Sequence, residues 1–285
     1  MPEKIFITDF DGTLLKDDKT IAHEDIDALK QLKNYGIITC IATGRSIYSF
    51  DKILKGFNYE FNFPLDYLIF STGAGIMNFQ SREILCNYYL NESDIVFISD
   101  YFEKLQLDYM VHKPIPETHC FVYRSHGTEN PDFFRRIDLY KKYALLLNKN
   151  EMLKGFGKST QILSIIPQKL NNSMSDIIKK IRRDLAQFSV VPATSPLDNK
   201  SLWIEVFNKK VSKSKAASFL VKKLEVKKEN LFAIGNDYND MDLLQWSGKG
   251  YIVENAIEEL KGFFDMVPSN NNCGVSAAIG KCINH

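Results

Sequence analysis

The sequence predicts an α/β fold in which a parallel-sheet core is interrupted by an inserted α+β segment. Short apolar runs alternate with an amphipathic helix at the start of the chain, and the same rhythm returns after Lys213. Buried strands separated by crossover helices produce this rhythm in parallel sheets. Between about Arg82 and Phe207 the chain is richer in aromatic residues and its apolar positions alternate. Such alternation is typical of antiparallel strands.

The first part of the chain supplies three candidate strands, at Ile5 to Ile7, Ile37 to Ala42 and Leu65 to Phe70. A helix is expected from about Glu24 to Tyr35, and Gly36 is its expected C-terminal stop. Each strand ends in polar residues. Ligand-binding groups are therefore expected there, because open parallel sheets bind ligands at the carboxyl ends of their strands.

The insert and the last part of the chain have their own patterns. Segments 109–112 and 120–123 alternate like antiparallel strands, and a helix is expected over 177–185. The elements expected after Lys213 are a helix over 216–224, a strand over 231–234, a helix from 240, a strand over 251–253 and a final helical stretch. The predicted division is therefore a core of residues 1–82 and 208–285, with a domain of residues 83–207 inserted in it.

Composition and charge indicate a globular protein and argue against nucleic acid as a partner. The chain has 285 residues, of which 45% are hydrophobic and 25% charged, and its formal net charge is +1. This balance allows one large or two medium domains without disulfide or metal staples. Nucleic-acid-binding proteins usually carry a strong basic excess, which this chain lacks.

The cysteines and the N-terminus indicate a cytoplasmic protein. The five cysteines are scattered, and none has the spacing of a zinc site or a redox pair. The N-terminus lacks the apolar stretch of a signal peptide, and no apolar run is long enough to cross a membrane. We expect a reducing, cytoplasmic environment, no membrane partner, and a monomer or a homodimer.

Two aspartates follow the first candidate strand, in the run Asp9-Phe10-Asp11-Gly12-Thr13. Residues two apart on a strand point the same way, so the carboxylates of Asp9 and Asp11 are expected to lie together. Such a pair suits a hard cation, or a nucleophile next to an acid/base group. Gly12 allows a sharp turn. The alternative is a capped turn with two solvated aspartates.

Thr43-Gly44-Arg45 follows the second strand, and Lys213 precedes the helix that restarts the core rhythm. A hydroxyl and free backbone N–H groups at such a turn can bind a phosphate oxygen. Taken alone, Thr43 and Gly44 fit an ordinary strand-to-helix turn better than a phosphate site, and a single lysine such as Lys213 is usually a surface residue.

Acidic and amide side chains also follow the strand at 231–234, in the loop Gly235-Asn236-Asp237-Tyr238-Asn239-Asp240. Oxygen ligands at the carboxyl end of a strand favour a metal ion such as Mg²⁺. The alternative is an Asx-type turn that caps the helix starting at Asp240.

In this order the four motifs resemble those of the haloacid dehalogenase-like hydrolases. That superfamily has D-x-D-G-T, a Thr or Ser after the second strand, a Lys, and an acidic loop of the G-D-x-x-N-D type. The form Thr43-Gly44-Arg45, the Val-Ser-Lys approach to Lys213 and the Gly274-Val275 tail resemble its Cof-type sugar-phosphatase branch. The resemblance implies a Rossmann-like parallel-sheet core with an α+β cap domain inserted between the second and third motifs.

The resemblance also implies a chemistry: a magnesium-dependent phosphatase that hydrolyses small phosphorylated metabolites, such as sugar phosphates, through an aspartyl-phosphate. Asp9 would be the nucleophile and Asp11 the general acid/base, while Lys213, Thr43 and Gly44 would bind the phosphoryl oxygens. The implied magnesium ligands are Asp9, Asp11 through its carbonyl oxygen, Asn236 and Asp240, with Asp237 as a possible substitute.

The chain departs from the branch at three positions. The branch usually has Asp where this chain has Asn236, Asn where it has Thr72, and Gly where it has Ser214. An amide oxygen can still bind magnesium, so no catalytic group is missing. Two alternatives remain: a phosphomutase, and a ligand-binding or regulatory protein on a catalytically weak core.

Substrate selectivity is expected to reside in the insert. Candidates for contacting the leaving group are Arg45 next to the phosphate turn and, in the insert, the polar residues His112, His119 and Arg124. The alternative for each insert residue is that it only decorates the surface.

Overall fold

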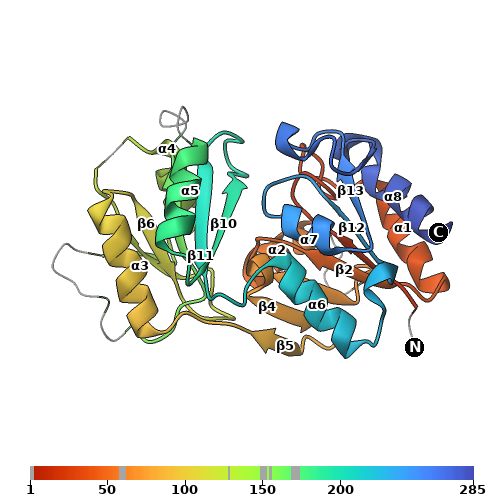
Figure 1. Cartoon of the computed structure of the whole chain (residues 1–285), viewed down its shortest axis with the longest axis horizontal. Coiled ribbons are helices and arrows are strands. Elements are labelled where there is room, and N and C mark those ends of the chain that lie inside the picture. Colours follow the sequence, from red (N-terminus) through yellow and green to blue (C-terminus); the bar gives the residue numbers. More distant parts are fainter. Residues whose placement is uncertain (1–2, 58–61, 128, 148–152, 154–155, 168–173) are drawn as a thin grey trace. The chain divides into compact units, whose positions relative to one another are not determined.

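The computed structural model describes residues 3–57, 62–127, 129–147, 153, 156–167 and 174–285. The chain forms two compact units. Unit 1 comprises residues 1–45, 49–87 and 212–285, and unit 2 comprises residues 46–48 and 88–211. Each unit has its own sheet, and the two sheets are described separately below (Figure 1).

Unit 1 is built on an eight-stranded sheet with the order β14-β13-β12-β1-β2-β3-β4-β5. The strands are β1 (Ile5–Thr8), β2 (Ile38–Ala42), β3 (Tyr67–Phe70), β4 (Gly75–Asn78), β5 (Ile84–Asn87), β12 (Leu231–Gly235), β13 (Lys249–Val253) and β14 (Asp265–Val267). Neighbouring strands from β14 to β3 are parallel, whereas β4 is antiparallel to both of its neighbours, β3 and β5. The predicted parallel α/β core is confirmed. The antiparallel extension was not predicted.

Helices cover both faces of this sheet. They are α1 (His23–Asn34), α2 (Ile47–Gly56), α6 (Lys213–Lys223), α7 (Met241–Trp246) and α8 (Gly274–Ile283). Figure 1 shows α1 and α8 on one side of the sheet, and α6 and α7 on the other. Helix α1 buries Ile26, Leu29 and Leu32, which is the apolar stripe expected from their spacing. It ends before Gly36, whose φ of +66° suits a glycine.

Unit 2 is built on a six-stranded sheet with the order β10-β11-β9-β6-β7-β8. Its strands are β6 (Tyr109–His112), β7 (Phe121–Arg124), β8 (Ala144–Leu146), β9 (Ile162–Ile166), β10 (Ser189–Thr194) and β11 (Leu202–Phe207), and its helices are α3 (Glu92–Lys104), α4 (Pro131–Leu139) and α5 (Met174–Asp184). All neighbouring strands are antiparallel except β7 and β8. The predicted antiparallel strands near 109–112 and 120–123 are confirmed as β6 and β7.

The sheet of unit 2 has an apolar cluster on each face. Ile98 and Phe102 of α3 and Ile181 of α5 belong to one cluster, which includes the β6 residues Tyr109 and Val111. The other cluster contains Met110, Phe133 of α4 and Trp203. The indole Nε1 of Trp203 donates a hydrogen bond to Asp132 Oδ2 at 2.8 Å, so α4 is tied to this second face. Within the described ranges, no helix combines the length and hydropathy needed to cross a membrane.

Candidate active site

The carboxyl ends of β12, β1 and β2 bring three of the predicted motifs to one edge of the unit 1 sheet. The three strands are adjacent and parallel, and Thr8 pairs with both Ile234 and Ile41. Asp9 directly follows β1, Thr43 directly follows β2, and the loop that begins at Asn236 follows β12. The residues singled out in the sequence therefore come from neighbouring strand ends, where open parallel sheets bind ligands.

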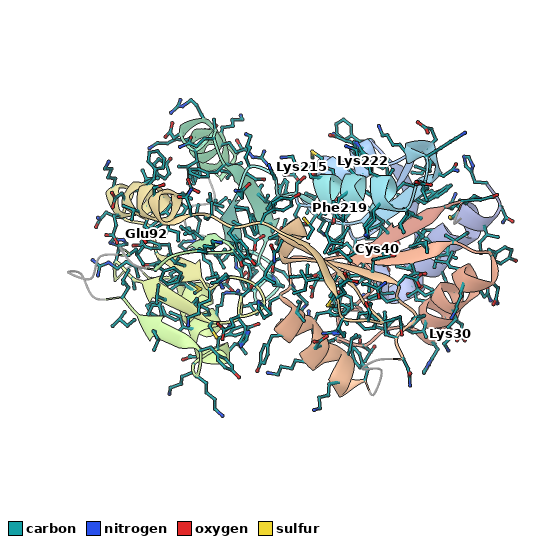
Figure 2. The ribbon with its side chains drawn as sticks, turned by 90° about the horizontal axis from the view of Figure 1, so that it is seen from below. Lys30, Cys40, Glu92, Lys215, Phe219 and Lys222 are labelled. Atoms are coloured by element: carbon teal, nitrogen blue, oxygen red, sulfur yellow. The ribbon has the colours of Figure 1, made fainter. Side chains whose placement is uncertain are left out.

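Lys213 joins this edge from α6 and is fully buried. Its Nζ donates to Asp9 Oδ1 and to Asp240 Oδ1, both at 2.6 Å. By contrast, Lys215 and Lys222 of the same helix are exposed (labelled in Figure 2). Gly73 allows the close approach: with φ at +99°, a Cβ there would lie 2.4 Å from the carbonyl oxygen of Ser212. Lys213 is therefore not the ordinary surface lysine that its residue type alone favours.

Burial and charge perturb the protonation of this cluster. Burial, and after it the nearby charge of Asp240, raise the pKa of Asp9 to about 7, although Lys213 opposes both effects. Burial alone lowers the pKa of Lys213, but the carboxylates of Asp240 and Asp9 raise it above its ordinary value. The lysine therefore stays protonated, and in the metal-free protein Asp9 exchanges its proton near neutral pH.

Asp240 organises the loop after β12. Its Oδ2 accepts hydrogen bonds from the backbone N–H groups of Asn236 at 3.0 Å and Asp237 at 3.1 Å, and its Oδ1 accepts from Lys213. Gly235 leaves the necessary space, because a Cβ there would lie 2.4 Å from Asp240 Cγ. From the sequence, Asp240 is expected among the magnesium ligands. In the structure both of its oxygens hold the loop and the lysine.

Three oxygen-bearing groups, the Asp9 carboxylate, the Asp11 carbonyl and the Asn236 amide, converge and fit a divalent cation. The amide end of Asn236 lies 3.2 Å from the Asp11 carbonyl oxygen and 3.3 Å from Asp9 Oδ2. In one amide orientation Oδ1 faces these two oxygens and accepts from Thr13 Oγ1 at 3.2 Å, and in the other the amide nitrogen donates to them. Oxygens roughly 3 Å apart match the octahedral magnesium shell. Without a cation, the second orientation avoids their repulsion.

Gly12 makes room for this arrangement. Its φ is +74°, and a Cβ there would lie 2.6 Å from the Asn236 amide nitrogen. Among the described residues, no group of three or more His, Cys, Asp or Glu side chains could hold a metal ion. The converging set has a different chemistry, since it combines one carboxylate with a backbone carbonyl and an amide. Asp237, the possible substitute ligand, accepts from the backbone N–H of Tyr238 at 2.8 Å.

Asp11 forms a two-point ion pair with Arg45. The Arg45 Nε donates to Asp11 Oδ2 at 2.7 Å, and its Nη2 donates to Asp11 Oδ1 at 2.6 Å. Arg45 Nη1 also donates to Ser49 Oγ at 2.9 Å. This fork geometry is a strong, oriented form of ion pair. Arg45, expected from the sequence to contact substrate, therefore lies on the candidate acid/base residue.

The turn after β2 has a defined local structure. Thr43 is buried, and its Oγ1 accepts from the backbone N–H of Arg45 at 3.1 Å. Its carbonyl oxygen accepts from the backbone N–H of Thr72 at 3.0 Å. This turn leaves the Thr43 hydroxyl proton to donate to an anion. Gly44 lies within the same turn, next to the residue that holds Asp11.

Two of the candidates in unit 2, His112 and Arg124, lie apart. His112 pairs with Phe121 and Tyr109 pairs with Arg124, so the histidine and the arginine lie at opposite ends of the β6–β7 ladder. Arg124 is ion-paired with Glu103, Nε to Oε1 at 3.1 Å. His112 is 1% exposed and does not decorate the surface. Burial lowers the pKa of His119.

Sequence reasoning gave no role to two side chains that support the site. Thr13 belongs to the D-x-D-G-T run, and its hydroxyl donates to Asn236 in one amide orientation. Asn255 Nδ2 donates to the Gly12 carbonyl oxygen at 2.8 Å. Thr13 could have been identified from the sequence, because it is the last residue of the D-x-D-G-T motif. Asn255 lies 243 positions from Gly12, and no sequence signal connects them.

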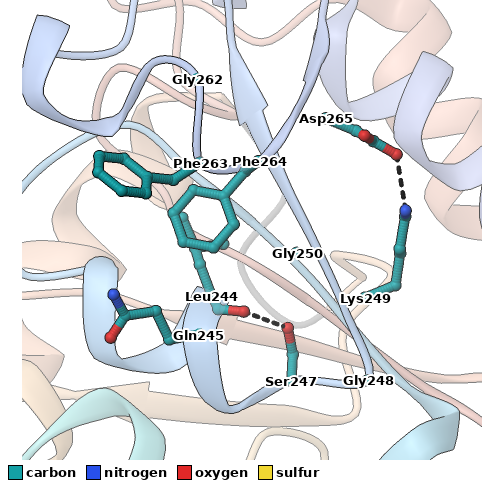
Figure 3. Close-up of a pocket in the computed structure, with 10 residues that line it drawn as sticks. All are labelled: Leu244, Gln245, Ser247, Gly248, Lys249, Gly250, Gly262, Phe263, Phe264 and Asp265. Carbon is teal, nitrogen blue, oxygen red and sulfur yellow. Dashed lines mark hydrogen bonds and ion pairs between the residues drawn. The ribbon is translucent and has the colours of Figure 1, made fainter.

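A separate, open pocket lies at the β13–β14 edge of unit 1 (Figure 3). It is lined by residues 244–245, 247–250 and 262–265, among them the 74% exposed Phe263. Lys249 and Asp265 form an ion pair at its rim, with a distance of 2.7 Å. None of the candidate site residues lines this pocket.

Comparisons with known proteins show what the whole chain is similar to. The family model of the haloacid dehalogenase-like hydrolases matches residues 6–279. A Bacillus subtilis protein, provisionally named a phosphatase, is 27% identical, with 98% of both chains covered. A 5-amino-6-(5-phospho-D-ribitylamino)uracil phosphatase of the same organism is 22% identical over 92% of this chain and 91% of its own. A solved structure of a subclass IIB sugar phosphatase has a TM-score of 0.73 at 18% identity, with 98% of each chain covered.

Proposed function

The chain belongs to the haloacid dehalogenase-like hydrolases, and on that premise we propose that it is a magnesium-dependent phosphatase for small phosphorylated metabolites. The observation that carries the proposal is the buried Lys213, which bridges Asp9 and Asp240 at the carboxyl end of the parallel sheet. Burying a lysine and two carboxylates costs free energy even when they are paired and hydrogen-bonded, so such a cluster is weak evidence for stability alone. Such perturbed groups at a ligand-binding edge are typical of catalytic sites.

Asp9 is the proposed nucleophile. Its carboxylate attacks phosphorus, the bond from phosphorus to the leaving oxygen breaks, and an aspartyl-phosphate forms. Lys213 lies against Asp9 and balances the charge on the phosphoryl oxygens, and the Thr43 hydroxyl donates to one of them. Water then attacks the aspartyl-phosphate, which releases inorganic phosphate and regenerates Asp9.

Asp11 is the proposed general acid and base. It gives a proton to the leaving alkoxide and later takes one from the attacking water. In the structure both of its carboxylate oxygens accept hydrogen bonds from Arg45. For one of these oxygens to carry a proton, the guanidinium must first give up its hydrogen bond to that oxygen. We therefore propose that Arg45 positions Asp11 and that this ion pair opens during the catalytic cycle.

Asp9 Oδ2, the Asp11 carbonyl oxygen and Asn236 Oδ1 are the proposed magnesium ligands. When bound, Mg²⁺ supplies positive charge that stabilises the phosphoryl oxyanion. Asp240 helps to position these ligands, because its oxygens accept hydrogen bonds from Lys213 and from the loop backbone. Asp237 remains the possible substitute ligand.

The proposed substrates are phosphate esters of sugars or polyols. Two of the similar proteins are named for such compounds, one a ribityl phosphate and the other sugar phosphates. We assign the choice of leaving group to unit 2, which interrupts unit 1 between Thr43 and Lys213 as the cap does in the Cof-type branch. Unit 1 is proposed to bind and transfer the phosphoryl group, which all candidate substrates share.

Phosphate release tests this function directly. The purified chain is expected to hydrolyse p-nitrophenyl phosphate and a subset of sugar phosphates with Mg²⁺, and to lose this activity when a chelator removes the metal. Activity that persists without Mg²⁺ contradicts the metal assignment. Phosphoryl transfer between hydroxyl groups without release of phosphate indicates a phosphomutase. A folded, metal-loaded protein that acts on no ester indicates a ligand-binding role.

Asn236→Asp is expected to leave the enzyme active and to tighten Mg²⁺ binding by about tenfold, because ligand charge sets the affinity of oxygen sites. Calorimetric titration of the metal measures the change. The companion variant Asp237→Ala is expected to bind Mg²⁺ as the unmodified chain does. If Asn236→Asp removes magnesium dependence, or if Asp237→Ala abolishes metal binding, then Asp237 is the working ligand.

A further inference from the structure

The turn that follows the D-x-D pair in unit 1 is held by a side chain from the C-terminal part of the chain. Within the turn, the backbone N–H groups of Leu14 and Leu15 donate to the Phe10 carbonyl oxygen at 3.1 and 2.7 Å. Gly12 has a left-handed backbone, with φ at +74°, and its carbonyl oxygen accepts from Asn255 Nδ2 at 2.8 Å. Asn255 therefore holds the peptide group that follows Gly12.

The amide group of Asn255 has one orientation that satisfies both of its partners. Asn255 lies in the loop after β13, and its Oδ1 accepts from the backbone N–H of Asn270 at 2.9 Å. A backbone N–H can only donate, and a carbonyl oxygen can only accept. Exchanging the oxygen and the nitrogen of this amide would break both hydrogen bonds, so the donor toward Gly12 is fixed.

Asn270 holds the same turn further along the chain. It is fully buried, and its Nδ2 donates to the Leu15 carbonyl oxygen at 3.1 Å and to Asp17 Oδ1 at 3.0 Å. The neighbouring Asn271 exchanges two hydrogen bonds with Asp17: its Nδ2 donates to Oδ2 at 2.9 Å, and its Oδ1 accepts from the backbone N–H at 3.2 Å. Three asparagine amides therefore contact the turn at residues 12, 15 and 17.

The loop that carries Asn270 is itself anchored to the core of unit 1. The backbone N–H of Gly274 donates to the Ser269 carbonyl oxygen at 3.2 Å, and helix α8 begins at Gly274. Helix α8 is tied to α1 in turn, because Asp25 Oδ1 accepts from the backbone N–H of Ser276 at 2.7 Å. The asparagines are therefore supported by packed helices, which makes them suitable for fixing the position of the turn.

The residues after β13 also hold the other side of the proposed magnesium site. Two residues beyond Asn255, the backbone N–H of Ile257 donates to the carbonyl oxygen of Asn236 at 3.0 Å. Gly12 directly follows Asp11, whose carbonyl oxygen is a proposed ligand. One short segment therefore fixes the backbone on both sides of the 3.2 Å separation between the Asp11 carbonyl oxygen and the Asn236 amide.

Magnesium is sensitive to small displacements of its ligands, because it requires near-ideal octahedral geometry at about 2.0–2.1 Å. We propose that Asn255, supported by Asn270, is a positioning residue for the magnesium site, and that its hydrogen bond to Gly12 keeps the Asp11 carbonyl oxygen in place. The inference rests on the proposed magnesium-dependent function. Loss of a group that orients a metal ligand typically lowers metal affinity by about 10- to 100-fold.

Two variants of the exposed Asn255 test this role by calorimetric titration of Mg²⁺, which needs no substrate. Asn255→Ala removes both hydrogen bonds of the amide and is expected to weaken Mg²⁺ binding by about tenfold. Asn255→Asp keeps the acceptor for the Asn270 N–H but cannot donate to Gly12. Its added negative charge would by itself tighten binding. A weakening of about threefold or more, which we expect, therefore identifies the lost donor as the cause.

Asn230→Ala is the matched control, because Asn230 Nδ2 donates to the Glu3 carbonyl oxygen at 2.9 Å, near the opposite end of β1. It should bind Mg²⁺ as the unmodified chain does. Saturating Mg²⁺ should restore kcat of Asn255→Ala on p-nitrophenyl phosphate to within about threefold, since all proposed ligands remain. A dissociation constant of Asn255→Ala within about twofold of the unmodified value, or tighter binding by Asn255→Asp, overturns the inference. An unmodified chain that binds no Mg²⁺ refutes the magnesium site itself, and the positioning role with it.

Discussion

Asp9→Asn is expected to lower turnover by at least about four orders of magnitude, which is typical for loss of a covalent nucleophile. An amide cannot attack phosphorus, yet the asparagine carbonyl can still accept the hydrogen bond from Lys213 Nζ, which lies 2.6 Å from Asp9 Oδ1. The fold should therefore persist. Single-turnover release of phosphate, with circular dichroism and a melting curve, measures both parts of the expectation.

A matched control exists in Asp25, a second buried aspartate outside the site. It lies on α1, burial raises its pKa to about 6, and its Oδ1 accepts from the backbone N–H of Ser276 at 2.7 Å. Asp25→Asn should keep full activity. Residual activity of Asp9→Asn above about one part in a hundred would count against the nucleophile assignment, and an equal loss in Asp25→Asn would point to a general effect of removing buried charge.

Local patterns explain how much of the core could be predicted. The strands that position Asp9, Thr43 and Asn236 are short apolar runs that end in polar residues. Buried parallel strands typically have such continuous apolar runs, so these strands could be predicted from the sequence. Helix α1 was visible from its apolar spacing and its terminal glycine. Strand β4 was not, because it begins with Gly75 and no alternating pattern distinguishes it from a loop.

Contacts between distant residues explain what could not be predicted. Lys213 lies 204 positions from Asp9 and Arg45 lies 34 from Asp11, so only the folded chain shows which carboxylate each cation holds. Thr72 was visible as a departure from the branch. Its left-handed backbone, with φ at +57°, was not, although the asparagine usual there adopts that conformation more readily.

Lys213→Met is expected to abolish activity and to destabilise the metal-free protein by about 3–5 kcal/mol, because it leaves two buried carboxylates without their partner. The loss of stability caused by Lys213→Met should increase as the pH rises. The pKa of Asp9 is already raised in the folded state, so the stability that its protonated form contributes disappears as pH rises through that pKa. Without the lysine, which lowers this pKa, the folded pKa rises further. Denaturant unfolding at pH 6 and pH 8 measures the trend.

Combining Lys213→Met with Asp9→Asn separates charge repulsion from lost packing. The double variant keeps only the Asp240 carboxylate in the buried cluster, so it should regain much of the stability that Lys213→Met loses, most clearly at pH 8, while staying inactive. Lys215→Met, an exposed position on the same helix, is the control and should change stability by less than about 0.5 kcal/mol. If Lys213→Met costs the same with and without the Asp9 carboxylate, the two residues are not coupled. The lysine then acts through Asp240 alone, and the ion pair with the nucleophile has no part in holding the site together.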